Sequence, residues 1–215
     1  MSTLDYILKK YNVDIGKRYV VDIPNMDRQG LSDLFTELNF DLGAEIGVHK
    51  GSYSEVLCKS NPKLHLYSID PWSPDAYEPG VHGADSEQEK YDFYHNEAKE
   101  KLSTYNCTII RKDSITAAKY FPDESLDFVY IDANHDFVNV TNDIHTWSKK
   151  VRSGGIISGH DYAYFPKRKH NHVKYVVQSY TRAFGIIPHF VVGADAVDIP
   201  DFVRDKIRSW FWIKK

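Results

Sequence analysis

The sequence predicts an α/β protein in which a doubly wound, mostly parallel sheet has helices on both of its faces. Three observations support this expectation. Short apolar segments, typical of buried strands, alternate with longer segments of helical periodicity. A glycine-containing turn joins the first of these strands to the helix that follows. Acidic residues stand at the carboxyl ends of most of the strands. Strands that alternate with helices in this way pair in parallel through right-handed crossovers.

The first 40 residues are expected to form a small helical extension, and residues 41–215 are expected to form the main domain. Helices are predicted over 4–11 and 31–40. In the second of these segments Leu31, Leu34 and Leu38 share one helical face, which would pack against the sheet.

In the main domain, strands are predicted at 43–48, 64–70, 107–110, 126–132 and 155–161, with late strands at 188–192 and 209–215. Helices are predicted from Ser52 onward and over 87–102, 115–121, 137–151 and 173–184. Two helices start with a capping-box pattern, Ser52 with Glu55 and Ser86 with Glu89. The pair Gly154–Gly155 is expected to end the helix over 137–151.

Composition narrows the class of protein. Of the 215 residues, 42% are apolar and 27% are charged, which excludes a wholly disordered or collagen-like chain. A net charge of −3 argues weakly against a dedicated nucleic-acid binder. No apolar run is long enough to cross a bilayer, and the N-terminus lacks the apolar stretch of a signal peptide. Cys58 and Cys107 form neither a zinc motif nor a disulfide framework. The expectation is a soluble, cytoplasmic protein.

Ligands of open parallel sheets bind outside the carboxyl ends of the strands, near the switch in strand order. The residues expected at those ends are Glu45, Gly47, Asp70, Asp113, Asp132, His160 and Asp161. An acidic residue at nearly every strand end indicates a functional edge, although such acids also cap helices and terminate strands.

The first motif is the turn from Glu45 to Ser52, with Gly47 and Gly51 four positions apart. It lacks the G-x-G-x-x-G of a dinucleotide site and the Gly-Lys-Ser/Thr of a P-loop. An acid at its start would repel phosphates and suits a cationic or hydroxyl-rich ligand. A plain tight turn is an equal alternative.

The second and third motifs follow the next two strands. Asp70 lies 25 positions after Glu45, a spacing at which an acid can accept both hydroxyls of a ribose, although an Asp-Pro turn gives the same pattern. Trp72 could stack on a base or anchor the loop. Asp113 could accept from an adenine amino group, with Ser114 beside it, or could cap the helix over 115–121.

The last two motifs are VYIDANHDF (129–137) and SGHDY (158–162). Neighbouring strands would bring Asp132, His135, His160 and Asp161 to one edge of the sheet. Two carboxylates and an imidazole can hold a divalent cation, which leaves His135 free for acid–base work at neutral pH. A structural hydrogen-bond cluster is the alternative.

In order and spacing, these motifs resemble those of the class I S-adenosylmethionine-dependent methyltransferases, which have a Rossmann-like fold. Within that class the chain is most similar to the branch with macrolide-sugar O-methyltransferases and related small-molecule enzymes. The resemblance covers roughly residues 40–165, and the segment SWFWIKK is similar to the closing strand of that branch. The first 40 residues and the loop over 162–174 match no pattern of this family.

The resemblance implies a set of site residues. The cofactor S-adenosylmethionine would contact residues at its amino-acid, ribose and adenine parts, namely Glu45, Gly47, Gly51, Ser52, Asp70, Trp72, Asp113, Ser114 and Asp132. Asp132, His160 and Asp161 stand at or beside positions that bind magnesium in metal-dependent members, although an imidazole suits softer cations better than Mg²⁺. His135 matches a position used as catalytic base in some members, and His160 is the first substitute.

The expected reaction is methyl transfer to a hydroxyl of a small molecule, such as a sugar or a hydroxylated natural product. A divalent cation could assist, and loops 71–86 and 162–174 would close over the site. The alternatives are a nucleotide-dependent dehydrogenase, which the missing G-x-G-x-x-G disfavours, and a non-catalytic adenosyl-ligand-binding module. Nucleic acid is a lesser option, suggested by the basic run over 167–174. A membrane partner is not expected, and homo-oligomerisation stays open.

Overall fold

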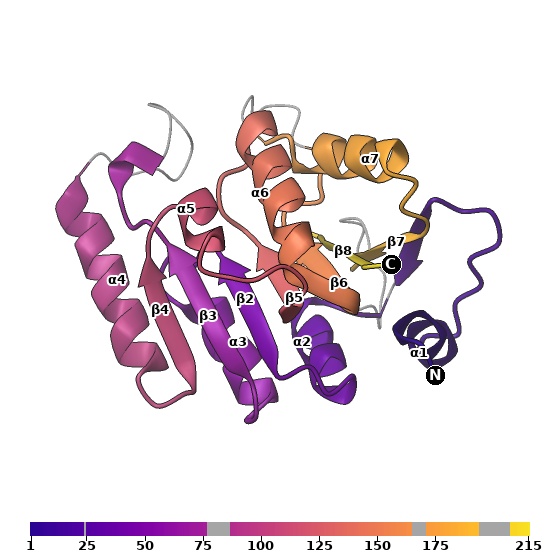
Figure 1. Cartoon of the computed structure of the whole chain (residues 1–215), viewed down its shortest axis with the longest axis horizontal. Helices are drawn as coiled ribbons and strands as arrows, with labels where there is room; N and C mark the ends of the chain where they lie inside the picture. Colours follow the sequence, from indigo (N-terminus) through magenta and orange to yellow (C-terminus); the bar gives the residue numbers. More distant parts are fainter. Residues whose placement is uncertain (24, 77–86, 165–170, 194–206) are drawn as a thin grey trace.

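The computed structural model describes residues 1–23, 25–76, 87–164, 171–193 and 207–215 (Figure 1). Ser86 of the expected capping pair, most of the closing loop over 71–86, and residues 167–170 of the basic run over 167–174 lie outside these residues.

One mixed sheet organises the described part of the chain. Its strands are β1 (Val20–Ile23), β2 (Leu42–Ile46), β3 (His65–Asp70), β4 (Cys107–Arg111), β5 (Leu126–Ile131), β6 (Val151–Gly159), β7 (His189–Val192) and β8 (Ser209–Ile213). They lie in the order β1-β7-β8-β6-β5-β2-β3-β4. All neighbours are parallel except β8, which is antiparallel to both β6 and β7. The sheet is therefore doubly wound and mostly parallel, as the sequence predicted.

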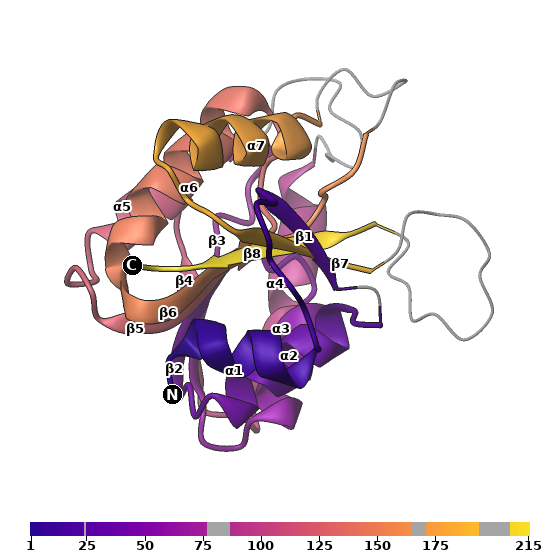
Figure 2. The same cartoon turned by 90° about the vertical axis from the view of Figure 1, so that its right-hand side faces the viewer.

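Helices cover both faces of this sheet, as Figure 2 shows along its edge. The helical elements are α1 (Thr3–Lys10), α2 (Arg28–Glu37), α3 (Ser52–Ser60), the short 3-10 turn η1 (Pro74–Ala76), α4 (Gln88–Leu102), α5 (Ser114–Ala118), α6 (Phe137–Lys150) and α7 (Val173–Ala183). Helices α5, α6 and α7 pack on one face, and α1, α2 and α3 pack on the other, whereas α4 lies against α3 beyond β4 (Figure 1).

Each face of the sheet has its own apolar core. Ile144 and Trp147 of α6 are fully buried against Val129 and Ile157 of the sheet. On the opposite face, Phe35 of α2 stacks on Phe128 of β5 with ring centroids 4.1 Å apart. β5 is buried along its whole length, and apart from Asp127 near its start its residues are apolar or aromatic on both faces. This burial explains why the central strands were readable as apolar runs.

The expectation of a wholly helical extension is wrong for residues 20–23. These residues form β1, which pairs in parallel with β7 at the edge of the sheet. Four residues are too few to show a strand period in the sequence, and β1 is held by a neighbour that comes about 170 positions later in the chain. Residues 20–23 thus extend the sheet of the main domain. The domain boundary at residue 40 stays an expectation.

Two local expectations also differ from the structure. Helix α6 ends at Lys150, and β6 begins at once with Val151, so that Gly154 lies inside a strand at a shift in register with β5. The capping box at Ser52 does not form, because Gly51, at a φ of 74°, is the N-cap of α3 and makes no side-chain bond. A glycine reaches this left-handed conformation without strain, so that it can start the helix where a serine cap was expected.

No helix in the described part of the chain is both long and apolar enough to span a bilayer.

Candidate functional site

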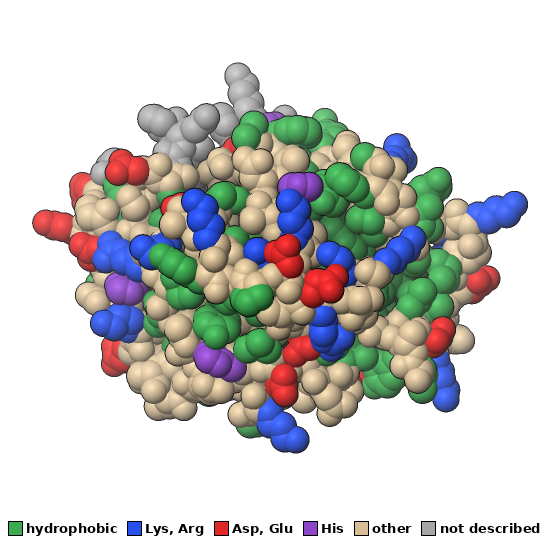
Figure 3. Space-filling view, viewed as in Figure 1, with side chains coloured by type: hydrophobic (Ala, Val, Ile, Leu, Met, Phe, Trp, Pro, Cys, Tyr) green, Lys and Arg blue, Asp and Glu red, His purple; other side chains and the backbone are tan. Residues whose placement is uncertain are grey.

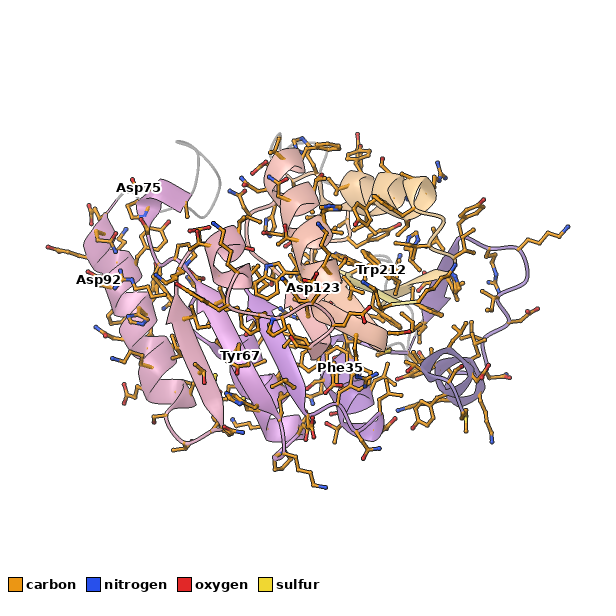
Figure 4. The ribbon with its side chains drawn as sticks, in the orientation of Figure 1. Phe35, Tyr67, Asp75, Asp92, Asp123 and Trp212 are labelled. Atoms are coloured by element: carbon orange, nitrogen blue, oxygen red, sulfur yellow. The ribbon has the colours of Figure 1, made fainter. Side chains whose placement is uncertain are left out.

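A cavity of about 530 Å³ opens at the carboxyl ends of β2, β3, β4 and β5. This edge contains the switch in strand order, since the chain proceeds from β2 to β3 and β4 on one side and then returns to β5 on the other. Its lining residues are Ile46, Gly47, Ile69, Asp70, Pro71, Asp75, Ala76, Asp113, Ser114, Ile115, Ala133, Asn134, Asn139 and Asp143. In Figure 4, Asp75 marks the η1 side of this upper edge.

Gly47 brings the turn after β2 into contact with the turn after β5. Its φ is 91°, and a Cβ built on it would lie 2.2 Å from the carbonyl oxygen of Asp132. Two backbone bonds secure this approach, from Gly47 N to Ile69 O at 2.9 Å and from Asp132 N to Ile46 O at 2.7 Å. The position therefore requires glycine, and the wall of the cavity is backbone here.

Asp70 holds the same turn from the end of β3. Its Oδ2 accepts from the backbone N–H groups of Val48 at 2.9 Å and His49 at 3.0 Å, and its Oδ1 accepts from Trp72 N at 2.7 Å. The carboxylate is only 5% exposed and lines the cavity. Asp70 thus fixes the glycine turn as well as facing the cavity.

Asp113 and Ser114 lie at the start of α5. The two alternatives expected for Asp113, a helix cap and a residue facing the ligand, occur together. Asp113 caps the helix by accepting from Thr116 N at 2.8 Å, and both residues line the cavity. Partial burial opposes ionisation of Asp113, but the hydrogen bonds from Thr116 outweigh it and lower its pKa.

Five of the residues expected at the cofactor do not line this cavity, and one of them, Asp132, belongs to the acid–histidine group described below. Trp72 is fully buried beneath the loop, where its indole N–H donates to the His49 carbonyl and its ring packs against His95. It is thus the loop anchor, not a stacking platform, because its positive φ turns the side chain inward. Ser52 is exposed and accepts from Lys101 at 3.2 Å, and Gly51 packs against Ala98 of α4.

Glu45 is another of these residues. Its side chain lies beneath α3, where Ser54 donates a hydrogen bond to it, and it is 2% exposed. Burial raises the pKa of this carboxyl well above its usual range. Glu45 therefore does not face the cavity as expected, but lies behind the glycine turn, where it supports that turn.

The expected acid–histidine group does assemble, beside the cavity. His135 Nε2 lies 3.0 Å from Asp161 Oδ2 and 3.5 Å from Asp132 Oδ1. His160 Nδ1 lies 3.4 Å from Asp161 Oδ2 and 3.9 Å from Asp132 Oδ2. Ala133 and Asn134, between Asp132 and His135 in the chain, form part of the cavity wall. One short turn after β5 therefore connects the cavity to the cluster.

The sequence predicts a His135 imidazole that is free to accept a proton at neutral pH, whereas its surroundings favour the protonated form. Burial lowers the pKa of this imidazole, but the close carboxylates of Asp132 and Asp161 outweigh that effect and raise it to about 10. In the same way, burial opposes ionisation of Asp161, but His135 and His160 hold its pKa well below the usual range. In the absence of a bound cation the imidazole is thus positively charged at neutral pH.

The donor set also differs from the expected one. Single ligand atoms of Asp132, His135 and Asp161 lie within 4.8 Å of one another, so that His135 takes the place expected for His160. Two carboxylate oxygens and one imidazole nitrogen are a suitable partial shell for a divalent cation. In the described structure the imidazolium of His135 supplies the positive charge between these acids.

Sequence reasoning missed several residues at this edge. Asn134 and Asn139 line the cavity, and Asn134 Nδ2 donates to the Ala76 carbonyl at 3.2 Å, which ties the turn after β5 to η1. Arg28 of α2 approaches Asp132 at 3.9 Å. Asp143 of α6 is 4% exposed and faces the cavity. A polar residue at a buried position of the amphipathic helix α6 was the signal that could have found it.

The fold and this edge together define a Rossmann-like methyltransferase fold: a doubly wound sheet with an antiparallel strand beside its last parallel one, and a cavity at the switch point. A family model described as "Methyltransferase domain" matches residues 44–162. The chain belongs to this family of methyltransferase domains. No curated protein has a significantly similar sequence.

Solved structures share this fold at low sequence identity. The O-methyltransferase TomG from Streptomyces achromogenes, in complex with S-adenosylmethionine, is 13% identical with a TM-score of 0.57, over 87% of this chain and 80% of that one. An O-methyltransferase from Bacillus cereus, in complex with S-adenosylhomocysteine, is 14% identical with a TM-score of 0.56, over 99% of this chain and 90% of that one. A protein from Clostridium thermocellum described as an rRNA methylase is 12% identical with a TM-score of 0.57, over 88% and 98%. The shared fold thus does not distinguish between acceptors.

Proposed function

We propose that this protein transfers the methyl group of S-adenosylmethionine to a hydroxyl group of a small molecule. The observation that carries the proposal is the position of the cavity directly beside the cluster of Asp132, His135 and Asp161, with the turn over 132–135 as their common wall. One compartment can then hold the methyl donor while the other holds the group that receives the methyl.

The cavity suits the donor in size and chemistry. Its volume of about 530 Å³ lies in the range of small-molecule sites. The backbone of Gly47 permits close approach, Asp70 offers carboxylate oxygens to ribose hydroxyls, and Ile46, Ile69 and Ile115 provide apolar surface for a base. When bound, S-adenosylmethionine supplies an electrophilic methyl group on a sulfonium. The remaining tasks of the protein are to align the acceptor and to take up its proton.

His135 is proposed to take up that proton. The carboxylates of Asp132 and Asp161 make its imidazole a stronger proton acceptor and stabilise the imidazolium once it has formed. The imidazole must first release its resting proton to solvent, and a cation held by the two carboxylates would favour this release by offsetting their negative charge. His160, 3.4 Å from Asp161, is the second candidate for this role.

A divalent cation is proposed as an assistant to this step. Asp132 and Asp161 would hold it, with His160 beside them, so that His135 keeps its role as the base; the cation would supply positive charge that lowers the pKa of an acceptor hydroxyl. The expected result is activity that falls in excess EDTA and returns with one of Mg²⁺, Mn²⁺ or Zn²⁺. Full activity in EDTA, with no metal found by elemental analysis, would leave a metal-free polar cluster.

The surface favours a small acceptor over a nucleic acid. On the face shown in Figure 3, Lys and Arg side chains are interspersed with Asp and Glu, whereas nucleic-acid binding uses a continuous basic strip. The net charge of −3 agrees with this preference.

The test has two parts. Calorimetry with S-adenosylhomocysteine should show binding, and NAD⁺ should show none, since a dinucleotide preference would support the dehydrogenase alternative. Mass spectrometry should then detect an acceptor with one added methyl group, together with S-adenosylhomocysteine, for some member of a panel of sugars and hydroxylated aromatic compounds. Binding without turnover on any such acceptor, or turnover on RNA alone, would contradict the proposed reaction.

A further inference from the structure

Asp143 is a buried carboxyl group that the proposed reaction does not use. It lies on α6, is 4% exposed, and lines the cavity opposite the start of α5. Among the described residues its hydrogen-bond partner is Ser114, and no Lys, Arg or His forms an ion pair with it. A carboxyl this deeply buried without a cation is costly unless its second oxygen finds a partner.

The hydrogen bonds around Ser114 have a defined direction. The indole N–H of Trp147, which can only donate, bonds to Ser114 Oγ at 2.8 Å. The hydroxyl proton of Ser114 is then directed to Asp143 Oδ1. Oδ1 thereby accepts from Ser114 and keeps a second lone pair, and no described residue forms a hydrogen bond with Oδ2.

The surroundings of Asp143 favour its neutral form. Burial is the larger cause and the negative charges of Asp136 and Asp113 add to it, so that the pKa rises to about 7 although the Ser114 bond opposes the change. In the neutral form, in which Oδ1 accepts from Ser114, the carboxyl carries its proton on Oδ2. It therefore offers one acceptor and one donor side by side.

We propose that Asp143 is a specificity-determining residue of the cofactor site, which recognises the 6-amino group and an adjacent ring nitrogen of adenine through paired hydrogen bonds. This inference rests on the proposed function. Adenine presents a donor at its amino group and an acceptor at the ring nitrogen, which complements the acceptor and donor of Asp143. Hypoxanthine reverses this pattern on its Watson–Crick edge, because it has a carbonyl oxygen and a protonated ring nitrogen there.

The experiment compares two probes by calorimetry, S-adenosylhomocysteine and its hypoxanthine counterpart S-inosylhomocysteine. The wild-type protein should bind the adenine probe at least about tenfold more tightly, because a site built to pair with a polar group rejects an analogue that cannot. D143N keeps an acceptor and a donor and should retain the preference. D143L offers neither, so its two affinities should agree within about threefold.

Controls separate this role from a structural one. D75N alters another carboxyl of the cavity and should leave the ratio of the two affinities unchanged. If D143L weakens both probes equally and keeps the ratio, Asp143 only supports the fold and the inference is overturned. Equal affinities in the wild-type protein would overturn it without any variant. If the wild-type protein binds neither probe, the proposed function itself fails, and the inference fails with it.

Discussion

Replacement of Gly47 by alanine should destabilise the protein more than the same replacement at a left-handed glycine elsewhere, because it should also disrupt the cofactor edge. Gly47 has a φ of 91°. A Cβ added to it would lie 2.2 Å from the Asp132 carbonyl oxygen and 2.6 Å from Ala133 Cα. Gly16 and Gly185 also have positive φ, at 51° and 61°, but an added Cβ there meets nothing within 4 Å. These two glycines provide matched controls for backbone strain.

The expected magnitude has two parts. An L-residue in the left-handed region costs about 1–2 kcal/mol, and this part applies to all three glycines. At Gly47 the clash is with backbone, so no change of rotamer relieves it, and the turns after β2 and β5 must separate. That separation weakens the bonds from Gly47 N and Asp132 N, each worth about 0.5–1.5 kcal/mol. G47A should therefore lose about 2–5 kcal/mol of stability, and G16A and G185A about 1–2 kcal/mol.

Urea unfolding of the three variants and the wild-type protein measures these differences, and calorimetry with S-adenosylhomocysteine measures the consequence at the site. G47A should bind at least about tenfold more weakly, because the displaced turn is a wall of the cavity. G16A and G185A should bind as the wild type does. If G47A were as stable as G185A with unchanged affinity, the close approach of the two turns would not be essential.

Four further predictions concern individual side chains of this edge. Asp70→Ala removes the acceptor of three backbone N–H groups and should weaken S-adenosylhomocysteine binding by about 1–3 kcal/mol, and an unchanged affinity in calorimetry would exclude Asp70 from the cofactor site. His135→Ala should lower kcat roughly 10²–10⁴-fold with cofactor affinity near that of the wild type, whereas a loss confined to melting temperature or metal affinity would indicate a supporting role. In the metal-free protein, NMR should find the His135 imidazole titrating near pH 10, and at a lower pH in Asp161→Asn. The folded protein holds the proton of Asp143 up to about pH 7, whereas the unfolded chain releases it near the ordinary pKa of 3.8, so stability should fall as pH rises between these values, by up to about 4 kcal/mol. Asp143→Asn should remove this dependence, and parallel pH–stability curves for variant and wild type would contradict it.

Much of the candidate site was predictable because polar residues that follow apolar strands end up at one edge of a parallel sheet. Asp70 and Asp113 were placed at the cavity from their position after a strand alone. The proximity of Asp132 to Asp161 follows from the pairing of β5 with β6 in the same way. These predictions needed only strand order and direction, which the alternation of apolar and helical segments defines.

Which of these side chains faces the cavity was not predictable, because neighbouring positions of a strand or turn point to opposite sides. Glu45 and Gly47 are two residues apart, and strand alternation would place them on the same side. Gly47 instead lies in the turn after β2, with a φ of 91°, and forms the cavity wall, whereas Glu45 lies beneath α3. The positive φ of Trp72 directs its ring into the core under the loop. Such orientations depend on the packing of α3 and α4 against the sheet.

By itself the sequence determined the class of fold, the order of the main elements and the edge where polar residues gather, because strand and helix periods and strand-end residues are local properties of the chain. The tertiary structure alone decided the rest. It placed β1 beside β7, seated His135 between two carboxylates, and directed Asp143 of α6 toward Ser114 of α5. Each of these depends on contacts between segments that are distant in the chain, and the pKa values of His135 and Asp143 follow from those contacts and from burial, which no local pattern encodes.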